Sequence, residues 1–362
     1  MPPSPPSSLV LILILLAANA LARAQTPAPR QVVVEADGTV HMPAQTVPPS
    51  SLLSAAGKTY LAEHLVNLQR PEMLVQKDGV PPLLAGYLAR QRELFPAERE
   101  DTTIGGVHAF VYTPKSGVAA DNRERVLIDL HGGGFRECWP ACAELESLPI
   151  ASLGRIKVVS LDYRQGPKHQ HPAASEDVAA AYLALLATHR PENIGIYGCS
   201  AGGMLTAMSV AWFQQHGLPR PGAVGLLCAG AASADGAAFG GDASYTTMPL
   251  GEARVIPPAA GGNPVRMDYF AGTDPNDPLV APASSAAVLA KFPPTLVVTG
   301  TRAFELSNAV YTHAQLVTNG VDADLHVWEG MFHGFFYNPD VPESRECYDV
   351  IVRFFANRLG KS

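Results

Sequence analysis

The serine of a glycine-rich pentapeptide is the first residue in this sequence that could do chemistry. Ser200 lies within Gly-Cys-Ser-Ala-Gly at residues 198–202, which fits the pattern G-x-S-x-G. An apolar run typical of a strand, Ile194 to Tyr197, precedes it, and a helical pattern starts at Met204. A sharp turn from strand to helix would hold the serine hydroxyl clear of the backbone, where it can attack a carbonyl carbon. The pentapeptide alone is a weak signal, but this context predicts a nucleophilic serine.

A second glycine-rich segment, His-Gly-Gly-Gly at residues 131–134, follows the apolar run Val126 to Leu130. Acyl transfer places negative charge on the carbonyl oxygen, and backbone N–H groups free of side chains can point at that oxygen. We expect the N–H groups of Gly132, Gly133 and Ala201 to form this oxyanion hole. Alone, the segment would fit a flexible turn. Together with the serine motif downstream, it favours a functional site.

A nucleophilic serine needs a base to take its proton, and the pKa of histidine suits that task. In an architecture of this kind the chain order is serine, then acid, then histidine. Three histidines lie beyond residue 300. His313 falls in a helical pattern and His326 inside a predicted strand, whereas His333 lies in a turn after that strand. His333 is therefore the predicted base.

The acid of such a triad should lie in the loop after the strand Leu296 to Thr299 and hold the imidazole through its second nitrogen. Glu305 is the only carboxylate of that loop, residues 300–305. A glutamate in the first turn of a helix can also stabilise the helix dipole without any catalytic role. We predict Glu305 as the acid, because the other carboxylates nearby precede the strand or follow the next helix.

Three residues after the His-Gly-Gly-Gly segment are candidates for the walls of a substrate pocket. Phe135, Arg136 and Trp139 could line the part that holds the acyl or the alcohol group. Phe135 and Trp139 could equally belong to the hydrophobic core, because large aromatic side chains dominate cores as well as binding sites.

The rest of the chain alternates between short apolar runs and helical patterns, which is typical of a mostly parallel sheet with helices on both faces. The predicted strands are Ala109–Tyr112, Val126–Leu130, Val158–Leu161, Ile194–Tyr197, Val224–Cys228, Leu296–Thr299 and Leu325–Trp328. The predicted helices are Ala173–Ala187, Met204–Gln215 and Leu306–Thr318. We assign the chain to the α/β class, with residues 101–362 as its catalytic domain.

Three further segments differ from this alternation. Residues 52–100 show helical periodicity interrupted by prolines and predict a helical cap ahead of the sheet. Residues 229–290 are too long for a simple connection and predict a helix-bearing insertion over the active site. Residues 25–51 predict a flexible surface arm, with a hairpin-like piece around Asp37-Gly38.

The N-terminus predicts export. The apolar run Leu9 to Leu16 is too short to span a bilayer comfortably and leads to Ala-Arg-Ala, so residues 1–24 fit a signal peptide. The preceding residues lack Lys and Arg, which leaves a misplaced start codon or an uncleaved anchor as alternatives. A periplasmic or secreted protein folds under oxidising conditions, where Cys138 and Cys142 could form a disulfide.

Composition excludes several function classes. The formal net charge of -7 and the absence of a Lys/Arg cluster argue against nucleic acid or an anionic membrane as a partner. The five cysteines show no zinc-ligand spacing, so we expect neither a metal site nor a cofactor. A small neutral or polar molecule is the expected partner, with no stable membrane association after signal cleavage. The sequence does not indicate an oligomeric state.

Taken in order, these motifs resemble those of the hormone-sensitive-lipase group of α/β-hydrolases, the bacterial carboxylesterases with a His-Gly-Gly-Gly motif. The resemblance covers roughly residues 100–360 and rests on segments 131–134, 162–164, 198–203, 274–278 and 333–335. It implies an eight-stranded sheet of the α/β-hydrolase fold, an N-terminal helical cap and a serine carboxylesterase acting on short-chain acyl esters. Two positions depart from the family. The family commonly has Asp where this chain has Cys199, and the acid of its triad is usually an Asp where this chain has Ala303.

Two alternatives stay open at the level of sequence. The same mechanism could act on an amide, a lactone or an acetylated carbohydrate. Because Ala303 replaces the usual acid, the chain could also be a non-catalytic binding protein that kept the fold and lost its chemistry.

Overall fold

The computed structural model describes residues 32–76, 79–232, 241–252 and 267–361. The chain divides into two compact units, Met1–Pro48 and Pro49–Ser362. The described part of the first unit holds an antiparallel hairpin of β1 (Val33–Val34) and β2 (Val40–His41), as its sequence predicts. The predicted signal peptide lies outside the described residues.

An eight-stranded sheet forms the centre of the second unit, in the order β10-β9-β8-β7-β5-β6-β4-β3. Its strands are β3 (Ala97–Ile104), β4 (Val107–Pro114), β5 (Val126–Leu130), β6 (Lys157–Leu161), β7 (Ile194–Cys199), β8 (Ala223–Leu227), β9 (Thr295–Gly300) and β10 (Ala323–Trp328). The strands from β10 to β6 pair in parallel, and β4 and β3 add antiparallel at one edge. The mostly parallel sheet predicted from continuous apolar runs is confirmed.

The order of the strands reverses between β5 and β7. β6 follows β5 along the chain and pairs on one side of it, whereas β7 pairs on its other side. In open α/β sheets, ligands bind outside the carboxyl ends of strands at such a switch point. The His-Gly-Gly-Gly segment follows β5 and Ser200 follows β7, so both motifs lie there.

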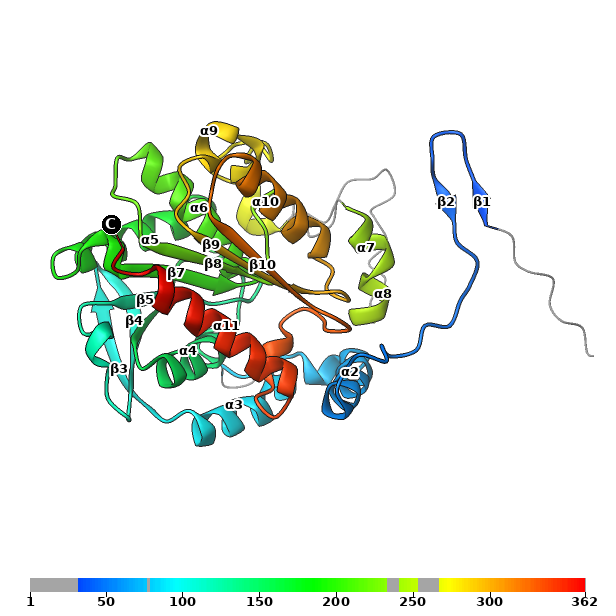
Figure 1. Cartoon of the computed structure of the whole chain (residues 1–362), viewed down its shortest axis with the longest axis horizontal. Coiled ribbons are helices and arrows are strands. Elements are labelled where there is room, and N and C mark those ends of the chain that lie inside the picture. The colour runs from blue at the N-terminus through cyan, green and yellow to red at the C-terminus, as the bar shows by residue number, and fades with distance from the viewer. Residues whose placement is uncertain (1–31, 77–78, 233–240, 253–266, 362) are drawn as a thin grey trace, which may run out of the picture. The chain divides into compact units, whose positions relative to one another are not determined.

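Helices cover both faces of the sheet (Figure 1). α4 (Ala141–Gly154) and α11 (Pro342–Arg358) pack on one face, and α5 (Ala173–Leu186), α6 (Ala201–Gln215) and α10 (Leu306–Thr318) pack on the other. Each face has its own large cluster of buried apolar side chains. The helices on the second face match the predicted ones, whereas α4 and α11 are not among the predicted elements.

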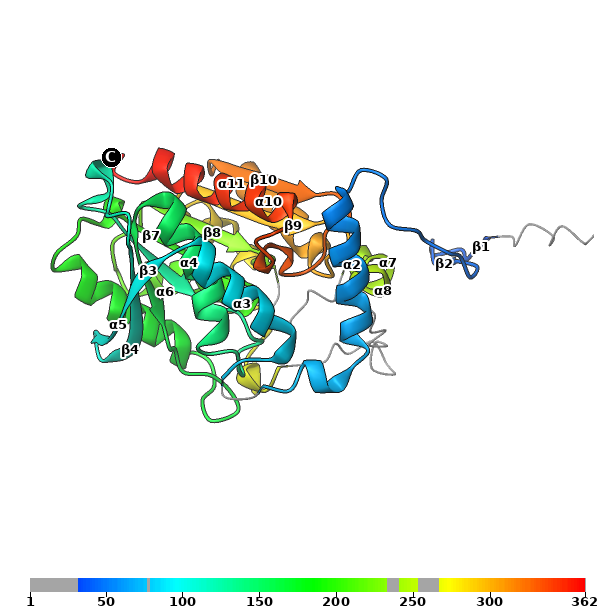
Figure 2. The same ribbon diagram turned by 90° about the horizontal axis from the view of Figure 1, so that it is seen from below.

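Two helices precede the sheet in the segment predicted as a cap, α2 (Ala55–Leu68) and α3 (Pro82–Leu94). α3 packs along α4 (Figure 2). The helical segment ends earlier than predicted, because β3 already begins at Ala97. Most residues of β3 are polar and exposed, as is common for edge strands, so the sequence gives little strand signal there.

The predicted insertion, residues 229–290, contains helices in its described parts: α7 (Asp242–Thr246), α8 (Met248–Gly251) and α9 (Ala286–Leu289). Short 3-10 turns complete the described chain: η1 (Pro71–Met73), η2 (Ala120–Asn122), η3 (Pro191–Asn193), η4 (Asp268–Phe270), η5 (Pro282–Ser284) and η6 (Phe335–Tyr337). Among the described residues, no helix has the length and apolar character needed to cross a membrane.

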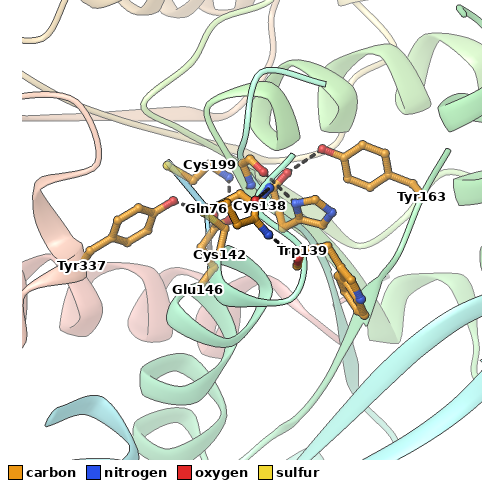
Figure 3. The surroundings of a disulfide bond; sticks show 10 residues. Gln76, Cys138, Trp139, Cys142, Glu146, Tyr163, Cys199 and Tyr337 are labelled. Atoms are coloured by element: carbon orange, nitrogen blue, oxygen red, sulfur yellow. Dashed lines mark hydrogen bonds between the residues drawn. A yellow bond between two sulfur atoms is a disulfide. The ribbon is translucent and has the colours of Figure 1, made fainter. Parts of the chain in front are cut away.

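Cys138 and Cys142 form a disulfide at the start of α4 (Figure 3). Gln76, in the cap, fixes the same loop, since it donates to the Trp139 carbonyl at 3.1 Å and accepts the Cys138 N–H at 3.3 Å. The other three cysteines, including Cys228, are free and buried. The disulfide that the sequence allowed is present, and it lies beside the His-Gly-Gly-Gly segment.

Removing this disulfide should destabilise the fold by about 2 kcal/mol, because closing so short a loop constrains the unfolded chain only modestly. The free energy of unfolding in urea, compared between the wild type and Cys138→Ser/Cys142→Ser, measures the effect. A reductant should bring the wild type to the level of the variant and leave the variant unchanged. Equal unfolding free energies without reductant would contradict the prediction.

Candidate active site

Ser200 occupies a tight turn between β7 and α6. Its backbone has φ 57° and ψ -122°, which non-glycine residues rarely adopt and which persists only where the surroundings enforce it. The end of β5 packs so closely here that a Cβ on Gly198 or Gly202 would lie 2.2 Å or 1.5 Å from the Leu130 carbonyl oxygen. Both glycines are therefore required, and the structure contains the predicted turn from strand through serine to helix.

The end of β8 connects Ser200 with the loop that carries His333. The Ser200 N–H donates to the carbonyl oxygen of Leu227 at 2.8 Å. The next residue, Cys228, accepts the Gly334 N–H on its sulfur at 3.3 Å. Ser200 and His333 thus border the same strand end, although they are far apart in the sequence.

The side chain of Glu305 holds His333. Its Oε2 lies 2.9 Å from His333 Nδ1, and its Oε1 accepts the Thr299 hydroxyl at 3.0 Å. Phe304 stacks on the imidazole, with ring centroids 4.4 Å apart. Because Nδ1 is bound, Nε2 is the nitrogen available to accept a proton. The two residues predicted as base and acid are therefore in direct contact, although Ala303 occupies the usual position of the acid.

The carboxylate also sets the charge state of the imidazole. Burial acts to lower the pKa of His333, but the charge of Glu305 and its hydrogen bond outweigh burial and raise the pKa to about 10. Cys228 and Glu252, which follows α8, act in the same direction. The surroundings thus favour imidazolium, the species that forms when the base takes a proton from serine.

The activity should consequently rise with pH, and the limb of the profile that reports deprotonation of His333 should lie at alkaline pH. Only neutral His333 can accept the serine proton, so kcat/KM falls as the pH drops below the His333 pKa. A raised pKa places this limb well above the ordinary value of 6.5. In Glu305→Gln the charge is gone while burial remains, so the limb should move toward acid. Profiles of kcat/KM against pH measure this shift, and coincident limbs in the two proteins would contradict it.

Hydrogen bonds fix two successive peptide groups of the His-Gly-Gly-Gly segment. The His131 carbonyl accepts the Tyr163 hydroxyl at 2.6 Å, and the Gly132 carbonyl accepts from His131 Nδ1 at 2.6 Å. Burial lowers the pKa of His131 to about 4, so the ring is neutral and keeps its proton on this nitrogen. In a planar trans peptide the N–H points away from the C=O. The Gly133 N–H therefore points away from the His131 ring.

The prediction that the Gly132 N–H belongs to the oxyanion hole is wrong. Its N–H donates to Glu146 Oε1 at 2.9 Å and is not available to a substrate. Within the described part of the chain, the N–H groups of Gly133, Gly134 and Ala201 donate to no other residue. The φ values of 121° and 65° at Gly133 and Gly134 favour glycine. Gly134, the last glycine of the motif, thus replaces Gly132 as the third candidate donor.

Comparison with known proteins identifies the family. A family model described as alpha/beta hydrolase fold matches residues 127–337, more than half of the chain. The chain belongs to this family. Among curated relatives of this hydrolase, an acetyl-hydrolase from Streptomyces hygroscopicus is 30% identical over 239 residues, which are 66% of this chain and 77% of the relative. The carboxylesterase/phospholipase LipF from Mycobacterium tuberculosis is 31% identical over 252 residues, 67% of this chain and 65% of LipF.

Solved structures place the hydrolase more narrowly. An esterase crystal structure superimposes with a TM-score of 0.74 at 29% identity, covering 88% of this chain and 98% of the other. An esterase from the bacterial hormone-sensitive lipase family gives 0.69 at 26% identity, covering 83% and 99%. The hydrolase is therefore hormone-sensitive-lipase-like, as its motifs indicated.

In the hydrolase, the three residues predicted for the pocket walls have different surroundings. Phe135 is 1% exposed and stacks on Tyr269 with ring centroids 4.7 Å apart, so its ring belongs to the core. Trp139 is partly buried and packs against aromatic rings of β4 and the His-Gly-Gly-Gly segment. Arg136 is exposed and borders a cleft of about 270 Å³ that also touches Gly134. Of the three, Arg136 is therefore the best placed to meet a ligand.

The cap of the hydrolase contributes residues that the sequence did not single out. His64 of α2 stacks on Phe332, the residue before His333, with ring centroids 3.7 Å apart. Tyr60, one helical turn earlier, meets the same ring at 4.9 Å. Burial lowers the pKa of His64 to about 3, so it stays neutral. The spacing of Tyr60 and His64 on one helix face is visible in the sequence, but the loop they pack on is not.

Cys228, Glu305 and His333 could in principle hold a metal ion, because one ligand atom from each lies within 4.8 Å of the others. Two of these groups already hydrogen-bond to each other. As it stands, the arrangement can pass a proton without a metal.

Proposed function

We propose that this hydrolase is a serine carboxylesterase that cleaves short-chain acyl esters through an acyl-enzyme intermediate. The observation that carries the proposal is the 2.9 Å hydrogen bond between Glu305 and His333, at the same strand end as the strained turn of Ser200. Such an arrangement supplies a base in a fixed tautomer beside a hydroxyl that the turn presents.

In the first half-reaction, Ser200 Oγ bonds to the ester carbonyl carbon while His333 Nε2 takes the hydroxyl proton. The charge on the carbonyl oxygen is bound by the free N–H groups of Gly133, Gly134 and Ala201. The intermediate collapses as His333 gives its proton to the departing alcohol, which leaves the acyl group on Ser200. Water then attacks this acyl group, with His333 as base, and releases the carboxylic acid.

The name of the acetyl-hydrolase relative supports a small acyl group, and the name of LipF, a carboxylesterase/phospholipase, supports ester hydrolysis without fixing the length of the acyl chain. Hydrolysis of p-nitrophenyl acetate, butyrate, octanoate and palmitate tests this. We expect the highest kcat/KM for acetate or butyrate and a decline for longer chains. A maximum at palmitate would exclude the short-chain assignment.

The name of the acetyl-hydrolase relative specifies an acetyl group but not the group that carries it, so the acetylated carbohydrate, amide and lactone left open by the sequence stay candidates. An acetylated sugar, an anilide and a lactone should be assayed beside the p-nitrophenyl esters. Faster turnover of one of them than of p-nitrophenyl acetate would reassign the substrate while leaving the mechanism unchanged.

Labelling with a fluorophosphonate tests the serine mechanism without reference to the substrate. The reagent phosphonylates an activated serine, so we expect the label on the peptide that contains Ser200. Heat-unfolded protein is the control and should not react. A protein that hydrolyses esters yet carries no label, or carries it elsewhere, would contradict the proposed nucleophile.

We also propose that the protein is exported to the periplasm or secreted. The apolar run Leu9 to Leu16 with its small-residue ending supports this, and so does the disulfide, since such bonds persist in oxidising compartments. Fractionation of expressing cells, followed by N-terminal sequencing, should find mature protein that begins at Gln25. Full-length protein confined to the cytoplasm would refute the proposal.

A further inference from the structure

Glu146 of α4 is a buried carboxylate, 2% exposed, among the loops of the active site (Figure 3). Its Oε1 accepts the Gly132 N–H at 2.9 Å and the Tyr337 hydroxyl at 2.7 Å. Its Oε2 accepts the Cys199 N–H at 3.1 Å. Each of these donors belongs to a different catalytic segment, so one side chain joins all three.

Each bond acts next to a residue that takes part in the proposed reaction. Gly132 directly precedes Gly133 and Gly134, whose N–H groups are free. Cys199 directly precedes Ser200. Tyr337 ends η6, and its own N–H donates to Gly334 at 3.1 Å, so it belongs to the loop that starts at His333. Movement of Glu146 would therefore displace the oxyanion hole, the nucleophile and the base relative to one another.

We infer that Glu146 is a positioning residue, which holds the oxyanion segment, the serine turn and the histidine loop in their reactive arrangement. This inference rests on the proposed function. Displacing reacting groups by about 1 Å can cost roughly 10²-fold in rate, so a shared anchor has a measurable effect on turnover. The fit is close, since a Cβ on Gly132 would lie 3.3 Å from Glu146 Oε1 and 3.4 Å from the Tyr337 hydroxyl.

The surroundings of Glu146 explain why a carboxylate can remain buried here. Among the groups that act on its pKa within the described residues there is no cation, and its neighbour is a second carboxyl group, Asp129 of β5. Asp129 accepts the hydroxyls of Ser160 and Ser147 at 2.6 Å and 3.2 Å. Burial raises the pKa of both carboxyls, and the charge of Asp129 raises the pKa of Glu146 further, so the site favours the neutral form of each group. The hydrogen bonds from Gly132, Cys199 and Tyr337 thus orient Glu146, so the loss of a single donor should change its position.

The experiment compares Glu146→Gln, Glu146→Ala and Tyr337→Phe with the wild type, by kcat and KM on p-nitrophenyl butyrate. In Glu146→Gln the side-chain amide replaces one acceptor oxygen, so at least one donor loses its partner. We expect kcat to fall roughly 10²-fold with KM nearly unchanged, and a smaller loss in Tyr337→Phe. Tyr337→Phe should cost nothing further in the Glu146→Ala background, because the bond that it removes is already absent.

Glu144→Gln is the matched control, because Glu144 lies on the same helix, is also buried, and binds Arg92 of the cap at 2.7 Å instead of a catalytic loop. It should lose stability and keep its kcat. All variants are assayed below their melting temperatures. If Glu146→Ala does not fold, the kcat values of Glu146→Gln and Tyr337→Phe test the inference. A kcat close to wild type in folded Glu146→Gln, or an equal loss in Glu144→Gln, overturns the inference. A wild type without turnover overturns the proposed function instead.

Discussion

Replacing Ser200 by alanine should abolish ester hydrolysis, with kcat lower by roughly 10⁶-fold, as for the nucleophile of other serine triads. Without the hydroxyl no acyl-enzyme can form, while the oxyanion donors still bind the carbonyl and give a small residual rate. The measurement is kcat for p-nitrophenyl acetate, together with loss of the fluorophosphonate label.

Ser209→Ala is the matched control for this variant. Ser209 lies on α6, the helix that Ser200 caps, and is fully buried. Its hydroxyl has no hydrogen-bond partner among the described residues, so its removal should change neither turnover nor labelling. Near-normal hydrolysis by Ser200→Ala would show that another group attacks the ester, and the proposed mechanism would fail.

The sequence predicts the central sheet well because its strands are buried on both faces. β5, β7, β8 and β9 consist of residues that are all buried, so they read as continuous apolar runs bounded by turn residues. Once these strands are predicted, the glycines around Ser200 and the histidine after β10 can be recognised because they lie directly after strands. The chemistry of these residue types thus predicted Ser200, His333 and Glu305 as a triad, and the structure places Glu305 and His333 in contact.

The element that the sequence concealed is α4. Almost all of its residues are buried, among them Glu144 and Glu146, so it shows no apolar stripe, and Pro149 inside it interrupts a segment otherwise rich in helix formers. Since Glu146 lies on this helix, its contact with Gly132 could not be anticipated either. The wrong assignment of Gly132 to the oxyanion hole has the same cause. The three glycines each offer an N–H group, and the sequence does not show that Glu146 binds the one of Gly132 and leaves those of Gly133 and Gly134 for a substrate.

α11 was missed for a different reason, because its signal is present in the sequence. Its buried residues recur at helical spacing, with Cys347, Tyr348, Ile351, Phe354 and Phe355 on one face. Charged residues lie between them, and Pro342 marks its first turn. A search for amphipathic periodicity through to the end of the chain would have found it.

Glu305→Gln should lower kcat by roughly 10⁴-fold, the loss seen when the acid of a serine triad becomes an amide. The side-chain amide can donate a hydrogen bond to Nδ1 and thereby stabilise the wrong tautomer of His333, with the proton on the nitrogen that must accept one from Ser200. The amide also carries no charge to stabilise imidazolium. Kinetics on p-nitrophenyl butyrate measure the loss, and the acid shift of the pH limb should accompany it. Glu305→Asp keeps the charge but is one methylene shorter, so an intermediate loss is expected.

Glu343→Gln serves as control, because Glu343 is also a buried carboxylate but accepts its hydrogen bonds from Ser54, at the start of the cap. It should reduce stability without changing the pH profile. Undiminished kcat and an unmoved limb in Glu305→Gln would mean that the acid lies elsewhere. Glu252 would then be the group to replace, because its charge also acts on His333. If neither substitution has an effect while Ser200→Ala is inactive, the serine and histidine work without an orienting carboxylate, and the contact between Glu305 and His333 is only structural.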